Sequence, residues 1–309
     1  MPPLPLHFWP AGCILSGVMT RNALESAGLS LHQAGASCYV PDELALPEAL
    51  ARATHVGIGA HPDDLELMAL PGILACRESS ENWFTGIVCT HGGSATRAGA
   101  ETRKRRRHEQ EAAARAGGYG LLIQLDYSSA AIRGADRPHL EEDLARLLER
   151  MHPATVYLHH PADRHDTHVA VSAASIRALR ALPAARRPAS VVGAEVWGSL
   201  DWLPAGARAE LDVSGEEAVS DELIQLFESQ IAGGKRYDLA ASGRRRANAT
   251  FRDPYAPDQA SEIILAMDLS PLMRDPALPI EDFLAGQLDR FREEILARLR
   301  RMTTDAGKT

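Results

Sequence analysis

The chain is poor in the features that mark secreted, membrane-spanning and nucleic-acid-binding proteins. It has only four cysteines in 309 residues, with no C-x-x-C pair, so a disulfide framework is not expected. No apolar run approaches the roughly 18 residues that a membrane span needs. The net charge of −8 at neutral pH argues against a nucleic-acid-binding surface. We therefore expect a cytoplasmic protein with reduced thiols and with neither a membrane nor a nucleic-acid partner.

The composition is that of an ordinary globular protein. Hydrophobic residues make up 45% of the chain and charged residues 24%, and 309 residues can bury a substantial core. Residues 1–20 hold an apolar patch without a preceding basic residue or a convincing cleavage site, so no signal peptide is expected. We expect an N-terminal extension over 1–53, a core over 54–250 and a C-terminal extension over 251–309.

Strand-like and helix-like stretches alternate from residue 54 onward. Strands are expected at 54–59, 84–90, 121–125, 155–159, 190–197, 210–213 and 263–269, and helices at 101–116, 140–151, 169–182 and 280–302. Two basic stretches with glycine, 233–236 and 243–246, are expected to be loops. The alternation predicts an α/β fold with a mostly parallel sheet, helices on both faces and an irregular C-terminal elaboration that ends in a long helix.

The helix expected at 280–302 is amphipathic. Its apolar residues follow one another at steps of three and four: Leu284, Leu288, Phe291, Ile295, Leu299 and Met302. This face either packs on its own domain or mediates oligomerisation, and we expect a homo-oligomer.

A dense group of polar residues follows the first expected strand. The segment from Ala60 to Met68 reads AHPDDLELM, and Pro62 suits the first turn of a helix that would continue to Ile73. In α/β folds, ligands bind outside the carboxyl ends of the strands. His61, Asp63 and Asp64 at that position suit one divalent metal and one general base.

A second polar group, Asp163 to His168, follows the strand expected at 155–159 and opens the next helix. A catalytic zinc usually takes three protein ligands, which His61, Asp64 and His168 would supply. Such a metal makes a water molecule more acidic, and Asp63 would act as the base toward it. His165 lies one helical turn before His168, and as an imidazolium it would stabilise an oxyanion or protonate a leaving amine.

Each residue alone has a simpler explanation. A single histidine at a strand end is usually a satisfied polar residue, and an aspartate there favours a helix start. The two groups occupy equivalent positions after two strands, which favours the metal site. A dinucleotide site is not favoured, because Gly57-x-Gly59 lacks the third glycine of that fingerprint.

AHPDD after a strand, with a later D-R-H-x-x-H, resembles the PIG-L/LmbE-like zinc de-N-acetylases over roughly residues 54–250. The resemblance implies a Rossmann-like fold and a small amino-sugar substrate, from which a GlcNAc-type N-acetyl group is removed. The implied cofactor is Zn2+, with Fe2+ or another divalent metal left open. The implied roles are those assigned above: His61, Asp64 and His168 as ligands, Asp63 as base and His165 as helper.

Three weaker matches extend the resemblance. Arg106-x-x-Glu109 is similar to the family's R-x-x-E helix, whose arginine approaches the substrate. Asp126 falls where the family often has a sugar-binding aspartate. The stretch Phe227 to Gln230 is similar to a late H-x-S-Q.

The chain also departs from the family pattern. Thr167 stands where the usual H-P-D-H motif has aspartate, which concerns the tuning of His165. Gly93 stands where the family's T-R-G-E has a substrate-contacting glutamate. The acceptor pocket is therefore expected to differ from that of the thiol-pathway deacetylases. His91 in this loop is a candidate substrate contact.

Two arginine-rich runs, 103–107 and 244–246, are either solvated faces or the lining of an anionic pocket. The second interpretation predicts an acidic or phosphorylated amino sugar. Trp197 and Trp202 are expected in the core or in the pocket wall. Two other functions stay open: an amidase for a different amide such as a thiol conjugate, and a non-catalytic carbohydrate-binding module that retains the metal.

Overall fold

The computed structural model describes residues 18–93, 97–234 and 236–304. These form a sheet of nine strands in the order β1-β2-β5-β4-β3-β6-β7-β9-β8. The strands are β1 Val18–Thr20, β2 Ser37–Tyr39, β3 His55–Gly59, β4 Phe84–Thr90, β5 Leu121–Tyr127, β6 Thr155–His159, β7 Ser190–Ala194, β8 Arg208–Asp212 and β9 Ile263–Asp268. The five central strands are parallel and both edges are antiparallel, which confirms the expected fold class.

The order of the central strands changes direction between β3 and β6. From β3 the chain proceeds outward to β4 and β5, and it then returns to β6 and β7 on the other side of β3. Connections therefore leave β3 and β6 in opposite directions, and such a topological switch point is where open α/β sheets bind ligands.

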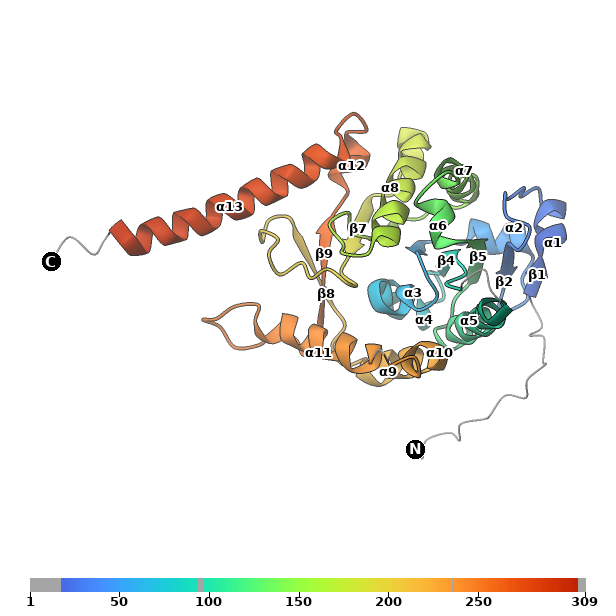
Figure 1. The fold of residues 1–309 in the computed structure, drawn as a ribbon, viewed down its shortest axis with the longest axis horizontal. Coiled ribbons are helices and arrows are strands. Elements are labelled where there is room, and N and C mark those ends of the chain that lie inside the picture. Colours follow the sequence, from blue (N-terminus) through green and yellow to red (C-terminus); the bar gives the residue numbers. More distant parts are fainter. Residues whose placement is uncertain (1–17, 94–96, 235, 305–309) are drawn as a thin grey trace.

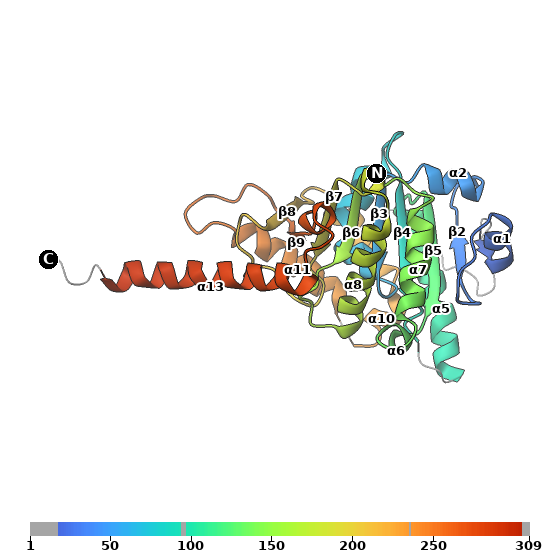
Figure 2. The same cartoon turned by 90° about the horizontal axis from the view of Figure 1, so that it is seen from above.

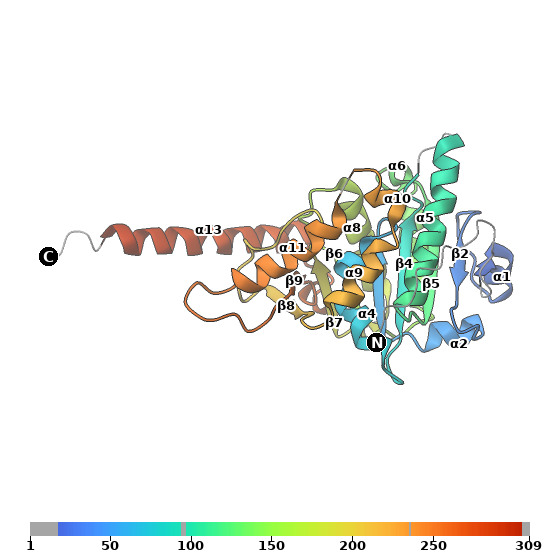
Figure 3. The ribbon, with the colours of Figure 1, turned by 90° about the horizontal axis from the view of Figure 1, so that it is seen from below.

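Helices cover both faces of the sheet (Figures 1–3). One face carries α6 Ser129–Ile132, α7 Arg137–Leu148 and α8 Asp166–Ala181. The other carries α3 Asp64–Met68, α4 Leu70–Arg77, α5 Arg97–Ala116, α9 Glu217–Gln225, α10 Glu228–Ile231 and α11 Tyr237–Thr250. Each face has its own hydrophobic core.

The chain ends add strands to the same sheet. Strands β1 and β2, with α1 Arg21–Ser26 and α2 Leu46–Ala51, come from the expected N-terminal extension, and β9 comes from the C-terminal one. A short 3-10 turn, Ala184–Arg186, joins α8 to β7, and a short helix, α12 Pro271–Arg274, follows β9. The last helix, α13 Ile280–Thr304, projects away from the body in all three views (Figures 1–3). The division into 1–53, 54–250 and 251–309 stays a prediction, although one sheet draws strands from all three.

Glycine explains how closely α3 lies against β3. A Cβ atom on Gly59 would lie 3.1 Å from the Cβ of Asp64, and one on Gly57 would lie 2.8 Å from the ring of Phe84 and 3.0 Å from Leu65. The Gly57-x-Gly59 pattern therefore serves close packing of the helix on the strand.

Two local expectations were wrong. The helix expected from Pro62 begins at Asp64 and breaks at Ala69, because Pro71 in the first turn of α4 has no N–H to continue the helix. The basic run 243–246, expected to be a loop, lies inside α11, where Arg245 is buried. The turn at Gly233 and Gly234 is as expected, while Lys235 lies outside the described residues.

Cys38, Cys76 and Cys89 are buried and free, as expected, while Cys13 lies outside the described residues. Among the helices of the described chain, none has the length and apolarity that crossing a bilayer would require.

Candidate metal centre

The two polar groups meet at the switch point. His61, Asp63 and Asp64 follow β3, and Asp163, His165 and His168 follow β6. Because β3 and β6 are hydrogen-bonded neighbours, their carboxyl ends bring the two loops together.

Three side-chain atoms form a nearly equilateral triangle. Asp64 Oδ2 lies 3.3 Å from His61 Nδ1 and 3.4 Å from His168 Nε2, and the two nitrogens are 3.3 Å apart. Ligands of a tetrahedral zinc, each about 2.0–2.2 Å from the ion, lie about 3.4 Å from one another. The spacing of the three atoms therefore fits a tetrahedral metal without rearrangement.

The proton positions support the same conclusion. His168 Nδ1 hydrogen-bonds to Asp163 Oδ2 at 3.4 Å, and since a carboxylate only accepts, Nδ1 carries the proton and Nε2 offers a lone pair. Ser129 Oγ lies 3.3 Å from His61 Nε2, which leaves His61 Nδ1 to face the triangle. The lone pair of His168 Nε2, the ring nitrogen Nδ1 of His61 and a carboxylate oxygen of Asp64 thus converge, and a cation between them would bind all three. The donor set fits a divalent metal.

His159, the last residue of β6, was not among the site residues predicted from the sequence. Its Nε2 lies 3.2 Å from Asp64 Oδ2, and its ring stacks on His168 with centroids 3.8 Å apart. The group of Asp64, His159 and His168 is fully buried and could also hold a metal. However, the backbone N–H of Ala60 donates to His159 Nε2 at 3.0 Å, so this lone pair is already used. The position of His159, at a strand end just before the second polar group, was the feature of the sequence that could have indicated it as a site residue.

Asp63 has an unusual backbone. Its φ is 95°, in the left-handed region that residues other than glycine rarely adopt. Two glutamines hold this turn: the N–H of Asp63 donates to Gln110 Oε1 at 3.1 Å, and Gln230 Nε2 donates to the carbonyl of Pro62 at 2.6 Å. Burial, and then the neighbouring carboxylates of Asp64 and Glu66, raise the pKa of Asp63 well above its usual range. Backbone strain of this kind concentrates at functional sites.

His165 differs from the expected cation. Burial and the adjacent imidazoles of His168 and His61 lower the pKa of His165 to about 4, which makes the ring neutral at pH 7. The N–H of Thr167 donates to His165 Nδ1 at 3.3 Å, so Nε2 carries the ring proton. Asp166, the residue before Thr167, is exposed, and its carboxylate lies 3.8 Å from Arg133. His165 is therefore a neutral hydrogen-bond donor in this structure.

A cavity of about 570 Å³ opens beside the triangle. His61, Asp63, Asp64 and His165 line it, together with Arg106, Ser129, Arg133, Trp197, Gln230 and Tyr237. Its volume is in the range of small-molecule sites. Of these lining residues, the sequence analysis did not single out Ser129, Arg133 or Tyr237.

The predicted substrate contacts divide between this cavity and a neighbouring crevice. Arg106 lines the cavity, and its Nη1 donates to the carbonyl of Gly92 at 2.7 Å. Asp126 instead pairs with Arg107 at 2.9 Å, and His91 Nδ1 accepts from the N–H of Gly93 at 3.1 Å. Asp126 and His91 line a small space of about 10 Å³ and not the cavity, and substrate contact by either stays a prediction.

The motifs of the weaker matches hold one another. Glu109 accepts hydrogen bonds from the backbone N–H of Ser229 at 2.8 Å and from its Oγ at 2.5 Å. Gln230, the next residue, reaches the carbonyl of Pro62. The helix α5, the helix α10 and the AHPDD loop therefore form one connected support for Asp63.

Comparison with known proteins finds a family match over the segment that carries the two polar groups. The sequence model of the family described as "PIG-L: GlcNAc-PI de-N-acetylase" matches residues 56–179, which include both polar groups. No curated protein sequence matches the chain.

Several solved structures share the fold. The 4-carboxy-2-hydroxymuconate hydratase GalB from Pseudomonas putida KT2440 is 17% identical with a TM-score of 0.54, over 70% of this chain and 96% of that one. The N,N'-diacetylchitobiose deacetylase from Pyrococcus horikoshii is 16% identical with a TM-score of 0.54, over 71% and 85%. The deacetylase of the A40926 pseudoaglycone is 17% identical with a TM-score of 0.52, over 70% and 97%. The PIG-L family model thus matches the segment that holds the candidate metal centre, and the similar structures share its fold.

Proposed function

We propose that this protein is a metal-dependent hydrolase that removes the N-acetyl group from a GlcNAc-type amino sugar or its conjugate. The observation that carries the proposal is the triangle of His61, Asp64 and His168, with Asp63 beside it in the same cavity. The family match and the two deacetylases among the similar structures support it. Because another similar structure is a hydratase, the fold alone does not choose the reaction.

The three ligands suit Zn2+, and Fe2+ would accept the same donors. A divalent ion held there would supply Lewis acidity toward the amide carbonyl and make a nearby water more acidic.

The side chains of the cavity then divide the remaining work. Asp63 takes the proton from the attacking water as its oxygen bonds to the amide carbon. His165 donates a hydrogen bond from Nε2 to the carbonyl oxygen as negative charge develops there. The C–N bond breaks, the acetate leaves, and the amine takes the proton that Asp63 had received. The glutamines that fix the Asp63 turn keep this base in place.

Metal analysis combined with acetate release tests the proposal. Protein purified without chelator should contain close to one divalent ion per chain and release acetate from a panel of N-acetylated amino sugars. Treatment with a chelator should abolish release, and zinc should restore it. Metal binding with amine release only from thiol-conjugate amides would favour that amidase instead. Metal and sugar binding without turnover of any amide would favour the binding module.

We further propose that the sugar carries an acidic or phosphate group. Two guanidinium groups, from Arg106 and Arg133, line the cavity, and arginine binds phosphate and carboxylate in a bidentate manner. The arginines at 244 and 245 do not line it; they border a separate space described below.

Finally, we propose that two copies of the chain associate through α13. Beyond its first turns, no element of the described chain covers this helix (Figures 1–3). Four of its apolar residues are exposed: Leu288, Ile295, Leu299 and Met302. Acidic residues begin the helix and arginines end it, so an antiparallel pair of copies would be complementary in charge.

A further inference from the structure

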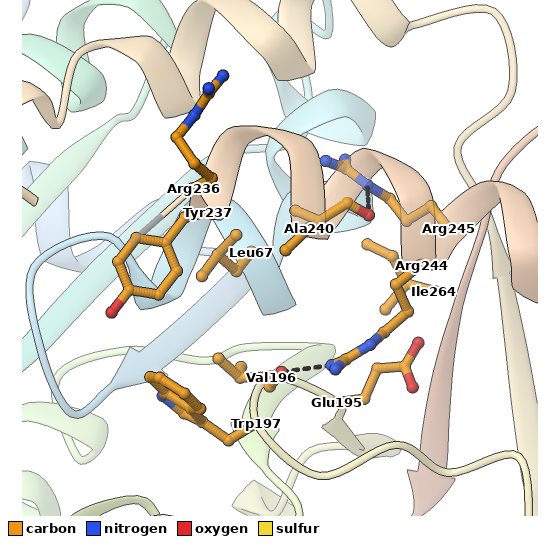
Figure 4. Close-up of a pocket in the computed structure, with 11 residues that line it drawn as sticks. Leu67, Glu195, Val196, Trp197, Arg236, Tyr237, Ala240, Arg244, Arg245 and Ile264 are labelled. Carbon is orange, nitrogen blue, oxygen red and sulfur yellow. Dashed lines mark hydrogen bonds between the residues drawn. The ribbon is translucent and has the colours of Figure 1, made fainter. Parts of the chain in front are cut away.

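A second cavity adjoins the metal cavity. This side cavity has a volume of about 280 Å³, several times the roughly 30 Å³ that one water occupies in the liquid. Leu67, Val196, Trp197 and Tyr237 line both spaces. Figure 4 shows Trp197 and Tyr237 at the same end of the side cavity, and their ring centroids are 6.0 Å apart. The two cavities therefore share an apolar and aromatic wall.

The rest of the lining is also mainly apolar. Ala240 comes from α11 and Ile264 from β9 (Figure 4). Ala241 of α11 also lines the side cavity. Most polar atoms at its border already have partners: Arg236 binds Asp238, Arg244 binds the carbonyl of Val196, and Glu195 accepts from Asn248 and from the N–H of Leu200. Arg245 binds Ser220 through Nη1, while its buried Nη2 has no hydrogen-bond partner. An occupant of the side cavity would therefore contact mostly carbon, which favours an apolar group.

The position of the side cavity connects it to the reaction. Leu67 lies one helical turn after Asp64, so the shared wall is close to the metal ligands. None of the histidines or aspartates of the metal centre lines the side cavity. It therefore suits a part of the ligand that is remote from the reacting bond.

We propose that the side cavity binds an apolar substituent, an aliphatic chain or an aryl group, of the substrate whose amide lies in the metal cavity. This proposal rests on the amide-hydrolase function proposed above. The substituent can belong to the acyl group or to the amine side, where an amino sugar would carry it as an aglycone. Binding energy gained there would raise kcat/KM for the extended substrate.

Two substrate series separate the sources. One lengthens the acyl group, from N-acetyl to N-butanoyl and N-hexanoyl glucosamine. The other keeps N-acetylglucosamine and changes its β-glycoside from methyl to hexyl and phenyl. We expect kcat/KM to rise by about tenfold or more in one series, since each methylene in an apolar pocket contributes at least that order. No rise in either series would overturn the proposal.

A filling substitution tests the location. Ala240 is exposed at the mouth of the side cavity, so Ala240→Phe can fill it without displacing the core. The ratio of kcat/KM for the preferred extended substrate to that for its shortest analogue should fall toward one. Leu239→Phe is the matched control, because Leu239 is the adjacent residue, is 61% exposed and lines neither cavity. An equal fall in both variants would contradict the assignment.

A binding measurement separates this proposal from the hydrolase proposal. The probe is hexyl N-acetylglucosaminide if the glycoside series is preferred, and N-hexanoyl glucosamine if the acyl series is. It should give a saturable change in tryptophan fluorescence, because Trp197 forms the shared wall. The shortest member of the same series and the Ala240→Phe variant should give a much weaker change. Such binding without hydrolysis would overturn the hydrolase and keep the side cavity. Hydrolysis without any preference for the apolar group would do the reverse.

Discussion

At the scale of single residues, adjacent aspartates have opposite surroundings. The Oδ2 of Asp64 accepts from the backbone N–H of His61 at 2.7 Å and lies beside three imidazoles. Burial alone would raise the pKa of Asp64, but His168 and His159 hold it well below its usual range. Burial, and then the carboxylates of Asp64 and Glu66, raise the pKa of Asp63. Environment thus separates a carboxylate suited to hold a cation from one suited to take a proton.

This difference predicts separable losses. Asp63→Asn should keep the metal and reduce kcat by about 10²–10⁴-fold, the usual contribution of a general base. His168→Ala should lose the metal, because it removes one of three ligands and uncovers Asp163. Plasma emission spectroscopy measures the metal content of each variant, and an acetate-release assay measures its kcat. Full metal content in His168→Ala would contradict the ligand assignment.

The anionic substrate hypothesis depends on one side chain in particular. Arg106→Ala should reduce kcat/KM for a phosphorylated N-acetylglucosamine by about tenfold or more, and should affect the neutral sugar less, because only the first loses a charge-assisted hydrogen bond. Lys104→Ala, two residues away, exposed and outside the cavity, is the control. Equal activity on both sugars, unchanged in Arg106→Ala, would argue against an acidic substrate.

The turn that carries Asp63 depends on Gln230. Gln230→Leu removes the hydrogen bond to the carbonyl of Pro62, and kcat should fall by about ten- to a hundredfold with metal content unchanged, because small misplacements of a catalytic group are costly. Gln225→Leu, an exposed glutamine on the neighbouring helix, should leave kcat unaltered. A rise in KM alone would show that Gln230 acts on substrate binding instead.

Residues near the metal differ in how visible they are in the sequence. The ligands predicted from AHPDD and D-R-H-x-x-H lie together because both motifs follow parallel strands, and strand ends are readable from short apolar runs. His159 was not predicted because it is the last residue of such an apolar run, and the run was interpreted only as a strand. Ser129, Arg133 and Tyr237 come from α6, the residue after it and α11, and no local pattern indicates that these segments converge.

At the scale of elements, α11 shows where local preference fails. The run Gly243 to Arg246 looks like a loop, yet its backbone is helical because α11 packs against α9 and β9. Arg245 is buried against Ser220 and lies 3.7 Å from the buried carboxylate of Glu262. Tertiary contacts that are distant in sequence therefore decide this helix, which also carries Tyr237 and Ala240 of the side cavity.

A pair of neighbouring arginines tests this account. Arg245→Met should reduce the free energy of unfolding by about 1–3 kcal/mol, because it leaves the buried hydroxyl of Ser220 without its donor and removes the buried partner of Glu262. Arg246→Met is the matched control: Arg246 contacts the same carboxylate at 3.2 Å from an exposed position and should contribute about 0–1 kcal/mol. Urea denaturation measures both. Similar losses would mean that burial of Arg245 does not hold α11.

At the scale of the whole molecule, one sheet joins segments from both ends of the described chain. The parallel centre was predictable from alternating strands and helices, whereas the antiparallel edges were only partly so. Strands β1 and β2 have three residues each and follow no clear pattern, and the insertion of β9 between β7 and β8 is a pairing between segments far apart in sequence. Among the elements that the structure describes, α13 is a long helix that lacks cover beyond its first turns.

The exposed face of α13 predicts a dimer in solution. Leu288, Ile295, Leu299 and Met302 are 49%, 44%, 55% and 71% exposed, and at 3.6 residues per turn they share one face. Leu299→Glu places a charge on that face and should weaken the dimer by at least about tenfold. Ala297→Glu places the same charge on the opposite face and should leave it intact. Light scattering during size-exclusion chromatography distinguishes the two, and a monomeric unaltered chain at micromolar concentration would exclude α13 as the contact between copies.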